Sequence, residues 1–317
     1  MSYPPKGSNN TDYDKRFLER AKAELRHDFG AQVRNIPKNS GKTVNFNRFT
    51  PLVLATTPLT EGTNPSAVGI TTTLTAATLS EFGNYVQVSS MFNMTGLDEN
   101  LAETVDVIAQ NAGETIDALI RNALSATNTR QLPATQSAVS STSAIHTTDT
   151  LTGLEIRRAV RTLKNNKAQK FPSGFYRGIV GAYPAMDLFG NSEWLDAHRY
   201  TTADQIERGV VGKLHGVEFV ESNQDTYDLS AGFSTSATNV ANVYTTYIFG
   251  SNAYGVVNID SYVGSKVYVK QPTDSDTSNP LNLYSTVGWK IPFVAVVLNT
   301  NWIVALKTGA TDGYNGG

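Results

Sequence analysis

Apolar side chains recur at helical spacing between residues 95 and 127 and predict one long helix there. Each recurs three or four residues after another, or at sums of these steps: Leu97, Leu101, Val105, Ile108, Ala112, Ile116, Leu119, Ala123 and Leu124. This spacing places a continuous apolar stripe on one face. Thr95 followed by Asp98 is typical of a helix start. A helix this long spans a small domain and offers other elements a surface along which to pack.

Two shorter amphipathic helices are predicted on either side of it. Residues 12–29 carry one apolar stripe and end before a glycine, with the stripe made of Phe17, Leu18, Ala21, Leu25 and Phe29. This short helix cannot bury its stripe alone, so we expect it to dock on its own chain or on a neighbour's. Residues 151–170 combine an apolar face (Leu154, Ile156, Val160 and Leu163) with a basic one (Arg157, Arg158, Arg161, Lys164, Lys167 and Lys170).

The segment 43–92 has a different pattern, that of a long β ribbon. TVNFNRF alternates polar and apolar residues, and VGITTTLTAATL and FGNYVQVSSMF are rich in Thr and Val. Between them, TPLTEGTNPS has the Pro and Gly of a turn region. Both faces of such a ribbon are too polar for a core. Because an isolated hairpin is marginally stable, we expect it to lie on something else.

The rest of the chain alternates strands and one helix, which predicts an α+β fold. Strands are expected in FYRGIVGA, VGKLHGVEFVES, YTTYIFGSNAYGVVNI and SKVYVKQP, and a helix in YPAMDLFGNSEWLDAHRY. The segment LYSTVGWKIPFVAVVLNTNWIVALKTG is the most apolar and reads as an antiparallel pair turned near Asn299–Asn301. We expect this pair to form a central sheet on the long helix, with a lobe of residues 178–272 inserted between pieces of one core.

Composition and charge favour a chain that buries its surface against partners. Charged residues make up only 17% of the 317 residues, and the net charge is −2. Residues 1–48 are rich in Lys and Arg, whereas no Lys or Arg occurs from Phe49 to Ile120. The acids of that block are Glu61, Glu81, Asp98, Glu99, Glu103, Asp106, Glu114 and Asp117. Such segregation suggests oppositely charged partners, although a solvated basic arm explains it equally well.

Several chemistries are excluded or weakly supported. The chain has no cysteine, so disulfides and thiolate sites are excluded. The histidines are not spaced as a metal pair: His27, His146, His198 and His215. Ser192, Asp196 and His198 lie close in sequence without a nucleophile-elbow motif. A hydrolase of the α/β-hydrolase or glycosidase kind, with a site near Asp187 and His198, therefore remains only a distant alternative.

Two other short motifs lack essential residues. GVVGKLHG has glycines too close together for a phosphate loop, and Leu214 replaces the hydroxyl residue that binds magnesium. DSDTS at 274–278 begins like a calcium loop, but Ser285 stands where the final acid is needed. The basic face of 157–170 can contact nucleic-acid phosphates only non-specifically, and a solvated or acid-paired face is the simpler interpretation. No catalytic, cofactor-binding or metal-binding residue is therefore expected.

No apolar run approaches the ~18–20 residues of a membrane span. The N-terminus MSYPPKGSNN has no apolar signal core, which disfavours a secreted adhesin.

Four phrases, in this order, resemble a known family. They are ATTPLTEGTNPSAVGITTTLTAATLSEFGNYVQVSSMF, GLDENLAETVDVIAQNAGETIDALIRNAL, VGKLHGVEFVES and VGWKIPFVAVVLNTNWIVALKTG. Together they resemble the major capsid proteins of tailed phages with the Hong Kong 97-type (Johnson) fold, in the subgroup typified by the N-four-like phages. The resemblance covers residues 50 to 308 and lies in the order of the phrases, none of which is a catalytic signature.

The resemblance implies a layout and a function. It implies an N-terminal arm (1–42), an extended loop over an adjacent subunit (43–93), a peripheral domain (94–177) with the spine helix 95–127, an axial domain (178–272) and a return to the peripheral domain (273–317). It implies an icosahedral shell in the virion, built of hexamers and pentamers, which encloses double-stranded DNA and has no enzymatic activity or cofactor. The implied partners are a scaffolding protein, a portal, a decoration protein and the packaged DNA.

Two departures from the best-known member give further expectations. Only 94 residues precede Thr95, so we expect no cleaved scaffolding domain and a separate scaffolding protein. Residues 49–92 contain no lysine, so we expect a shell without isopeptide cross-links. An encapsulin-type compartment loaded with an enzyme is the nearest alternative function, and nucleic acid or enzyme inside purified particles would separate the two.

Overall fold

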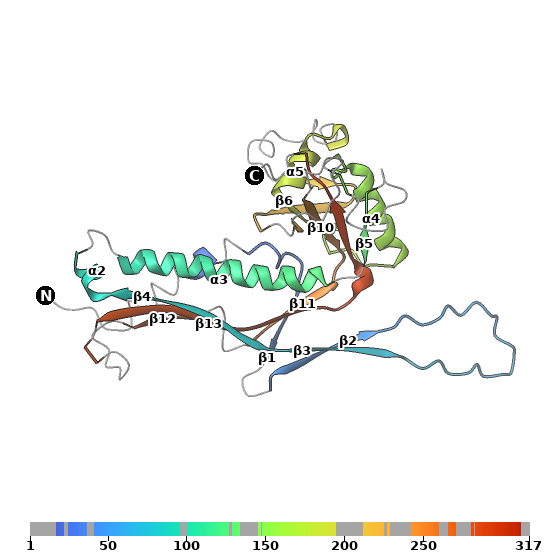
Figure 1. Cartoon of the computed structure of the whole chain (residues 1–317). Coiled ribbons are helices and arrows are strands. Elements are labelled where there is room, and N and C mark those ends of the chain that lie inside the picture. The colour runs from blue at the N-terminus through green and yellow to red at the C-terminus, as the bar shows by residue number, and fades with distance from the viewer. Residues whose placement is uncertain are drawn as a thin grey trace.

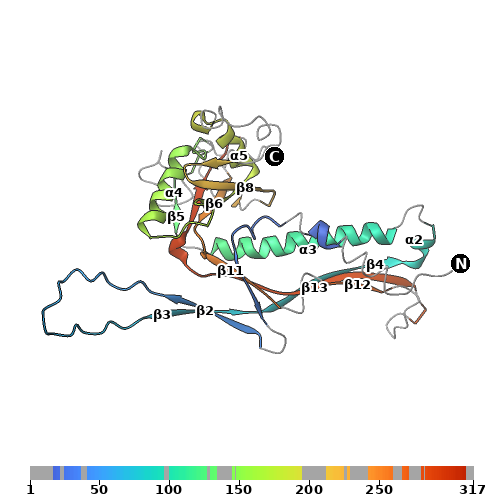
Figure 2. The same cartoon turned by 180° about the vertical axis from the view of Figure 1, so that it is seen from behind.

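The chain folds into a long sheet with a helix along it, a compact lobe at one end, and a ribbon that projects past that lobe (Figures 1 and 2). This computed structural model describes residues 17–21, 25–36, 41–95, 100–126, 129–133, 145–146, 148–194, 212–224, 227–228, 242–259, 266–270, 280–281 and 283–311. The predictions for Asp98, Asp196, His198 and the loop 274–278 lie outside these residues.

The long helix is confirmed as α3, Asn100–Ser125, with the short helix α2, Ser90–Thr95, before it. Its 26 residues make a rod of about 39 Å. Most of the apolar stripe predicted from spacing is the buried face, and the structure adds Ile120, which the prediction omitted. Leu119 and Ala123 of the predicted stripe are only partly buried, and the side chains of Leu97 and Leu101 lie outside the described ones. The buried side chains of this face include Val105, Ile108, Ala112, Ile116, Ile120 and Leu124.

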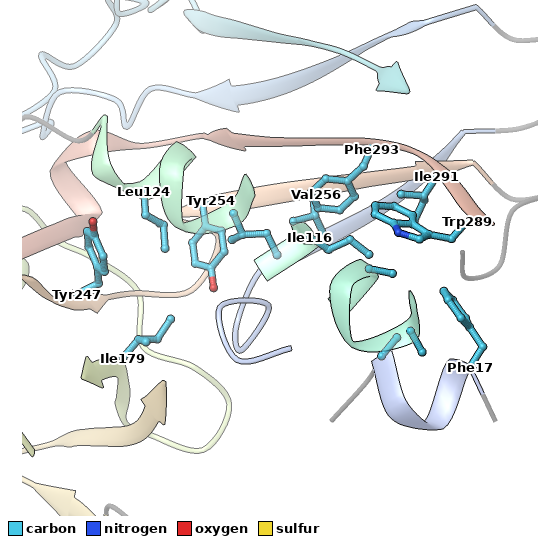
Figure 3. Packing of buried hydrophobic residues seen from close by; sticks show 14 of the residues in the cluster. Phe17, Ile116, Leu124, Ile179, Tyr247, Tyr254, Val256, Trp289, Ile291 and Phe293 are labelled. Carbon is cyan, nitrogen blue, oxygen red and sulfur yellow. The ribbon is translucent and has the colours of Figure 1, made fainter. Parts of the chain in front are cut away.

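The long sheet lies under α3 and has the spatial order β1-β11-β13-β12, with β4 beside Tyr284–Phe293 of β13. Trp289 of β13 is buried against α3, and its ring N–H donates to Oδ1 of Asn111 over 3.1 Å. Figure 3 shows Trp289 in one cluster with Ile116 of α3. The strands are β1 (Gln32–Ile36), β4 (Ser80–Ser89), β11 (Tyr254–Ile259), β12 (Lys266–Lys270) and β13 (Tyr284–Val297).

The compact lobe holds the second sheet, ordered β5-β14-β10-β6-β8-β7, with β9 beside β10. Two helices, α4 and α5, pack on one face of this sheet through Ile156, Leu163 and Leu188. The elements are β5 (Arg130–Gln131), α4 (Gly153–Asn165), β6 (Tyr176–Gly181), α5 (Ala182–Phe189), β7 (Lys213–Leu214), β8 (Val217–Ser222), β9 (Tyr227–Asp228), β10 (Val243–Phe249) and β14 (Ile303–Thr308).

The sequence predicted that the apolar C-terminal segment forms an antiparallel pair. This prediction is wrong. The chain does turn at the predicted place, through the short helix η2, Thr300–Trp302. However, β13 pairs with β4, β11 and β12, whereas β14 pairs with β10 and β5. The turn is therefore a crossover from the long sheet to the compact lobe, and only β13 packs on α3 as predicted.

The inserted lobe also differs from the expected segment 178–272. The structure places α4 and β5 in the lobe, and it places β11 and β12 in the long sheet. The chain leaves the lobe at the turn 250–253, between two strands of similar composition, which explains why periodicity did not locate the boundary. On α4 itself, Leu154 is exposed, contrary to prediction, and Glu155 is buried in its place, bonded to Arg158 and Gln131.

The arm helix predicted for 12–29 is wrong at its C-terminal end. Phe17–Ala21 is helical, and Phe17 and Ala21 are buried against α3, so the arm docks on its own chain (Figure 3). From Leu25 onward the chain is no longer helical, and it then forms β1, a strand that the sequence analysis did not foresee. The helix cannot continue because the N–H groups of Arg26 and His27 donate to the side chain of Asp117.

The ribbon is confirmed, but it is shorter than predicted. Its strands β2 (Thr43–Phe49) and β3 (Thr72–Thr78) pair in antiparallel register, with Phe49 opposite Thr72. Residues 50–71 extend the ribbon without regular strands. The final third of the predicted segment is β4, which lies in the long sheet beside β13. At its base the ribbon is held by Phe46, Ala77 and Leu79, which pack on Ile36 and Val257.

Candidate functional site

The ribbon projects from the rest of the chain (Figures 1 and 2). It exposes apolar side chains that nothing in the described chain covers. Val53 is 88% exposed and Leu54 77% exposed. The other large exposed apolar residues of the ribbon are Phe49, Leu52, Leu59, Val68, Ile70 and Leu74. At the tip, Thr63 N donates to Thr60 O, and Gly62 has a φ of 80°, a value that suits glycine at the third position of a turn. This exposed apolar surface requires a partner.

The arm is anchored to α3 by a buried carboxylate. Oδ1 of Asp117 accepts the N–H groups of Arg26 (2.8 Å) and His27 (2.6 Å), and Nδ1 of His27 lies 2.7 Å from Oδ2. Burial alone would raise the pKa of Asp117, but the hydrogen bond and the charge of His27, with the two N–H donors, hold it below its usual value. The hydroxyl of Tyr254 in β11 donates to the carbonyls of His27 and Phe29.

The same arm segment contacts the compact lobe. The Arg177 guanidinium lies 4.1 Å from the ring centroid of Phe29 and 4.3 Å from that of Phe171, so it stacks between the arm and the lobe. Gly30 has a φ of 99°, and a β-carbon there would come within 2.9 Å of Phe171 and Phe249. Residues 25–31 therefore pass between α3 and the lobe and contact both, which couples the two bodies.

The outer face of α4 is cationic. Two of its cations are engaged within the lobe: Arg157 pairs with Glu193 at 3.1 Å, and Arg158 pairs with Glu155 at 3.1 Å. The hydrogen bond with His215 lowers the pKa of Glu193, aided by the charge of Arg157. Arg161, Lys164 and Lys167 are exposed and have no ionic partner among the described residues. The predicted basic face is thus acid-paired at its start and solvated at its end.

A groove lies where the base of the ribbon meets the compact lobe. It consists of two adjoining cavities of about 450 and 350 Å³ that share Arg48, Phe49, Gln169 and Trp302. We call it the basal groove. Arg34 and Lys167 add two more cations, and none of the described residues that line either cavity is acidic. The groove therefore suits an anionic or strongly polar partner.

The structure does not gather the residues of the distant hydrolase alternative into a catalytic arrangement. Both carboxylate oxygens of Asp187 accept hydrogen bonds from Thr311, at 3.1 Å from its N–H and 2.5 Å from its hydroxyl. His198 lies outside the described residues. Of the other histidines, His27 contacts Asp117, and His215 contacts Glu193. Within the described ranges, no group of His, Asp or Glu residues could hold a metal ion, and no helix is long and apolar enough to cross a membrane.

Solved structures of similar shape are phage capsids. The capsid protein of cyanophage Pam1 matches with a TM-score of 0.68 over 98% of this chain and 97% of that chain, at 14% identity. The capsid of Ralstonia phage GP4 matches with a TM-score of 0.65 over 91% and 92%, at 11% identity. The chain has the Hong Kong 97-type capsid fold.

A third solved structure is similar with a lower TM-score than these two capsids. The virus-like particle from Pyrococcus furiosus has a TM-score of 0.53 over 94% of this chain and 99% of that chain, at 9% identity. No protein-family model and no curated protein matches the sequence. The fold is therefore shared with proteins whose sequences are only 9% to 14% identical to this chain.

Sequence reasoning missed two features of this capsid fold. It noted Asp117 only as one acid of a block, although its position beside Ile116, three residues before Ile120, places it on the buried face of α3. That position was a usable signal. The basal groove had no such signal, because Arg48, Lys167 and Trp302 come from three distant segments.

Proposed function

We propose that this protein is a major capsid protein that assembles into an icosahedral shell around the double-stranded DNA of a tailed bacteriophage. The observation that carries the proposal is the match of nearly the whole chain, projecting ribbon included, to phage capsid structures. The uncovered apolar side chains of the ribbon support it, because they are explained once copies of the chain cover one another. Closed shells need heterologous contacts of this kind.

We assign roles to the parts on the same basis. The long sheet with α3 serves as the peripheral domain, the compact lobe as the axial domain, and residues 43–79 as the extended loop. Within the family, we propose the subgroup typified by the N-four-like phages, because the four phrases between Ala55 and Gly309, in this order, resemble it.

We propose the following partners: further copies of this chain in hexamers and pentamers, a separate scaffolding protein, a portal, a decoration protein, and packaged DNA that touches the shell non-specifically. The exposed cations Arg161 and Lys164 of α4 supply charge for such DNA contacts. The absence of lysine between Phe49 and Phe92 supports a shell without isopeptide bonds.

A protein compartment loaded with an enzyme is the second candidate, on its similarity to the virus-like particle from Pyrococcus furiosus. The phage capsids match with higher TM-scores, which favours the first proposal.

The test is to express the chain with a candidate scaffolding protein, to image the product and to measure its sedimentation. Closed shells that hold nucleic acid support a capsid, whereas shells that hold a folded enzyme support the compartment. A monodisperse monomer at every concentration, with and without scaffold, would contradict both.

A further inference from the structure

Several polar side chains of the basal groove make no hydrogen bond or ion pair within the described chain. The side chains of Arg48 and Lys167 have no ionic partner or hydrogen bond among the described residues. The side-chain amides of Asn165, Gln169 and Asn301 are likewise free of hydrogen bonds within the described chain. A carboxamide offers one acceptor and two donor hydrogens, which is the complement of a peptide backbone. The groove is thus equipped for an extended peptide that also carries a negative charge.

Lys167 is held in the groove at a conformational cost. It follows the C-cap of α4 with a φ of 53°, in the left-handed region where glycine is the usual residue. The helix end has the hydrogen bonds of a Schellman motif, Ala168 N to Leu163 O and Lys167 N to Lys164 O. A lysine in place of the expected glycine points to a use for its side chain. Lys167 lines the same cavity as Arg48.

The matching feature on the same chain is the tip of the ribbon. From Phe49 to Ser80, Glu61 is the sole charged residue. It lies in the turn Thr60–Thr63 at the tip, next to Leu59, which is 76% exposed. The groove offers a complementary surface, with cations for the carboxylate and the rings of Phe49 and Trp302 for the apolar neighbour.

The tip of the ribbon cannot reach the basal groove of its own copy. Arg48 to Pro51 line the groove at the ribbon's base, and from there the ribbon runs away from the lobe to the tip (Figure 1). The twelve residue-to-residue steps from Phe49 to Glu61 extend up to roughly 40 Å. The tip of one copy can therefore reach only the groove of another copy.

We infer that Glu61 at the ribbon tip of one copy docks in the basal groove of a second copy, between Arg48 and Lys167. Each copy then offers one tip and one groove. Such a head-to-tail contact closes into a ring when the rotation between copies is a whole fraction of a turn. The inference rests on the proposed function and adds to it the two surfaces that join neighbouring subunits.

The direct test is a disulfide between copies, because the chain has no cysteine of its own. The double variant Glu61→Cys with Lys167→Cys is assembled, oxidised and run on a denaturing gel without reductant. We expect a ladder of covalent multimers that disappears on reduction. The matched control is Glu61→Cys with Lys164→Cys, which puts the second thiol at an exposed lysine of the same helix outside the groove. Particles without a ladder, or equal ladders from both pairs, would overturn the inference.

A charge exchange gives an independent readout. We expect Glu61→Lys and Arg48→Glu to raise the protein concentration needed for assembly by at least about tenfold each, because each places like charges in contact. The two changes together should restore assembly. Arg130→Glu, at an exposed cation of β5 outside the groove, is the control and should leave it unchanged.

The outcomes also separate this inference from its alternatives. If Arg48→Glu assembles normally and its particles hold less nucleic acid, the groove binds phosphate and the inference is wrong. If the wild-type chain forms no particles, the proposed function fails and the inference falls with it. Wild-type particles with neither the cross-link nor the charge rescue would overturn only the inference.

Discussion

The ribbon and the body formed by α3 and β13 differ in how far their apolar side chains are buried. In the body, Ile108 is 2% exposed and Val287 is fully buried, whereas Val53 of the ribbon is 88% exposed. The body reaches a stable arrangement within one copy because α3 covers the sheet. The ribbon has no second layer to cover it. The comparison teaches that the body stabilises the subunit and that the ribbon stabilises the assembly.

Excision of the ribbon is the strongest way to test that division. Replacing residues 50–71 by Asn-Gly joins Phe49 and Thr72, which already face each other, through a two-residue hairpin turn. We expect complete loss of particles by sedimentation. We expect the free energy of unfolding of the subunit to change by less than about 1 kcal/mol, because loop length has a weak effect on stability. A shortened chain that still assembles would contradict the division.

Loss of the arm anchor should have the largest effect on the subunit itself. Asp117→Ala leaves His27 without its carboxylate partner, and it leaves the buried N–H of His27 and the partly buried N–H of Arg26 without their acceptor, which costs about 3–5 kcal/mol. The measurement is urea unfolding of the unassembled chain. Glu103→Ala, at an exposed acid of the same helix, is the control and should stay within about 0.5 kcal/mol. Equal effects of the two changes would show that the anchor has no special role.

A truncation in the α3 core should come next. Ile108→Ala removes a buried side chain of the apolar stripe and should lower the free energy of unfolding by about 2–5 kcal/mol. Its neighbour Val107 is 65% exposed, so Val107→Ala should cost less than about 0.5 kcal/mol. Circular dichroism during urea unfolding measures both. A large effect at Val107 would mean that this face of α3 is covered even in the isolated subunit.

The smallest expected effect is a dependence on pH. The pKa of Asp117 is lower in the folded chain than its ordinary value of 3.8, so the unfolded state binds the proton more tightly. The carboxylate therefore contributes stability above pH 3.8, and that contribution is lost as the pH falls through the folded pKa. The stability difference between the wild type and Asp117→Asn should shrink from pH 6 to pH 3. A constant difference over this range would show that the charge of Asp117 is unimportant.

Local pattern was sufficient for elements whose partners did not need to be known. The stripe from Val105 to Leu124 predicted α3 because a 3.6-residue period is intrinsic to one helix. The ribbon was predictable because Thr- and Val-rich extended segments flank a turn region with Pro and Gly. The pairing of strands could not be predicted in this way. The segments of β13 and β14 have the pattern of one hairpin, and nothing in their alternation shows that they join different sheets. The arm helix failed at Leu25 for a similar reason, since Asp117, 90 residues away, takes the N–H group of His27.

The sequence by itself determined the long helix, the uncovered ribbon, the absence of cysteine chemistry and, through the order of its phrases, the resemblance to phage capsid proteins. These follow from periodicity and residue type, which act over a few residues at a time. Only the tertiary structure decided that residues 25–31 join α3 to the compact lobe and that Arg48, Lys167 and Trp302 form one groove. Contacts between distant segments depend on how whole elements pack, and no local pattern encodes that packing.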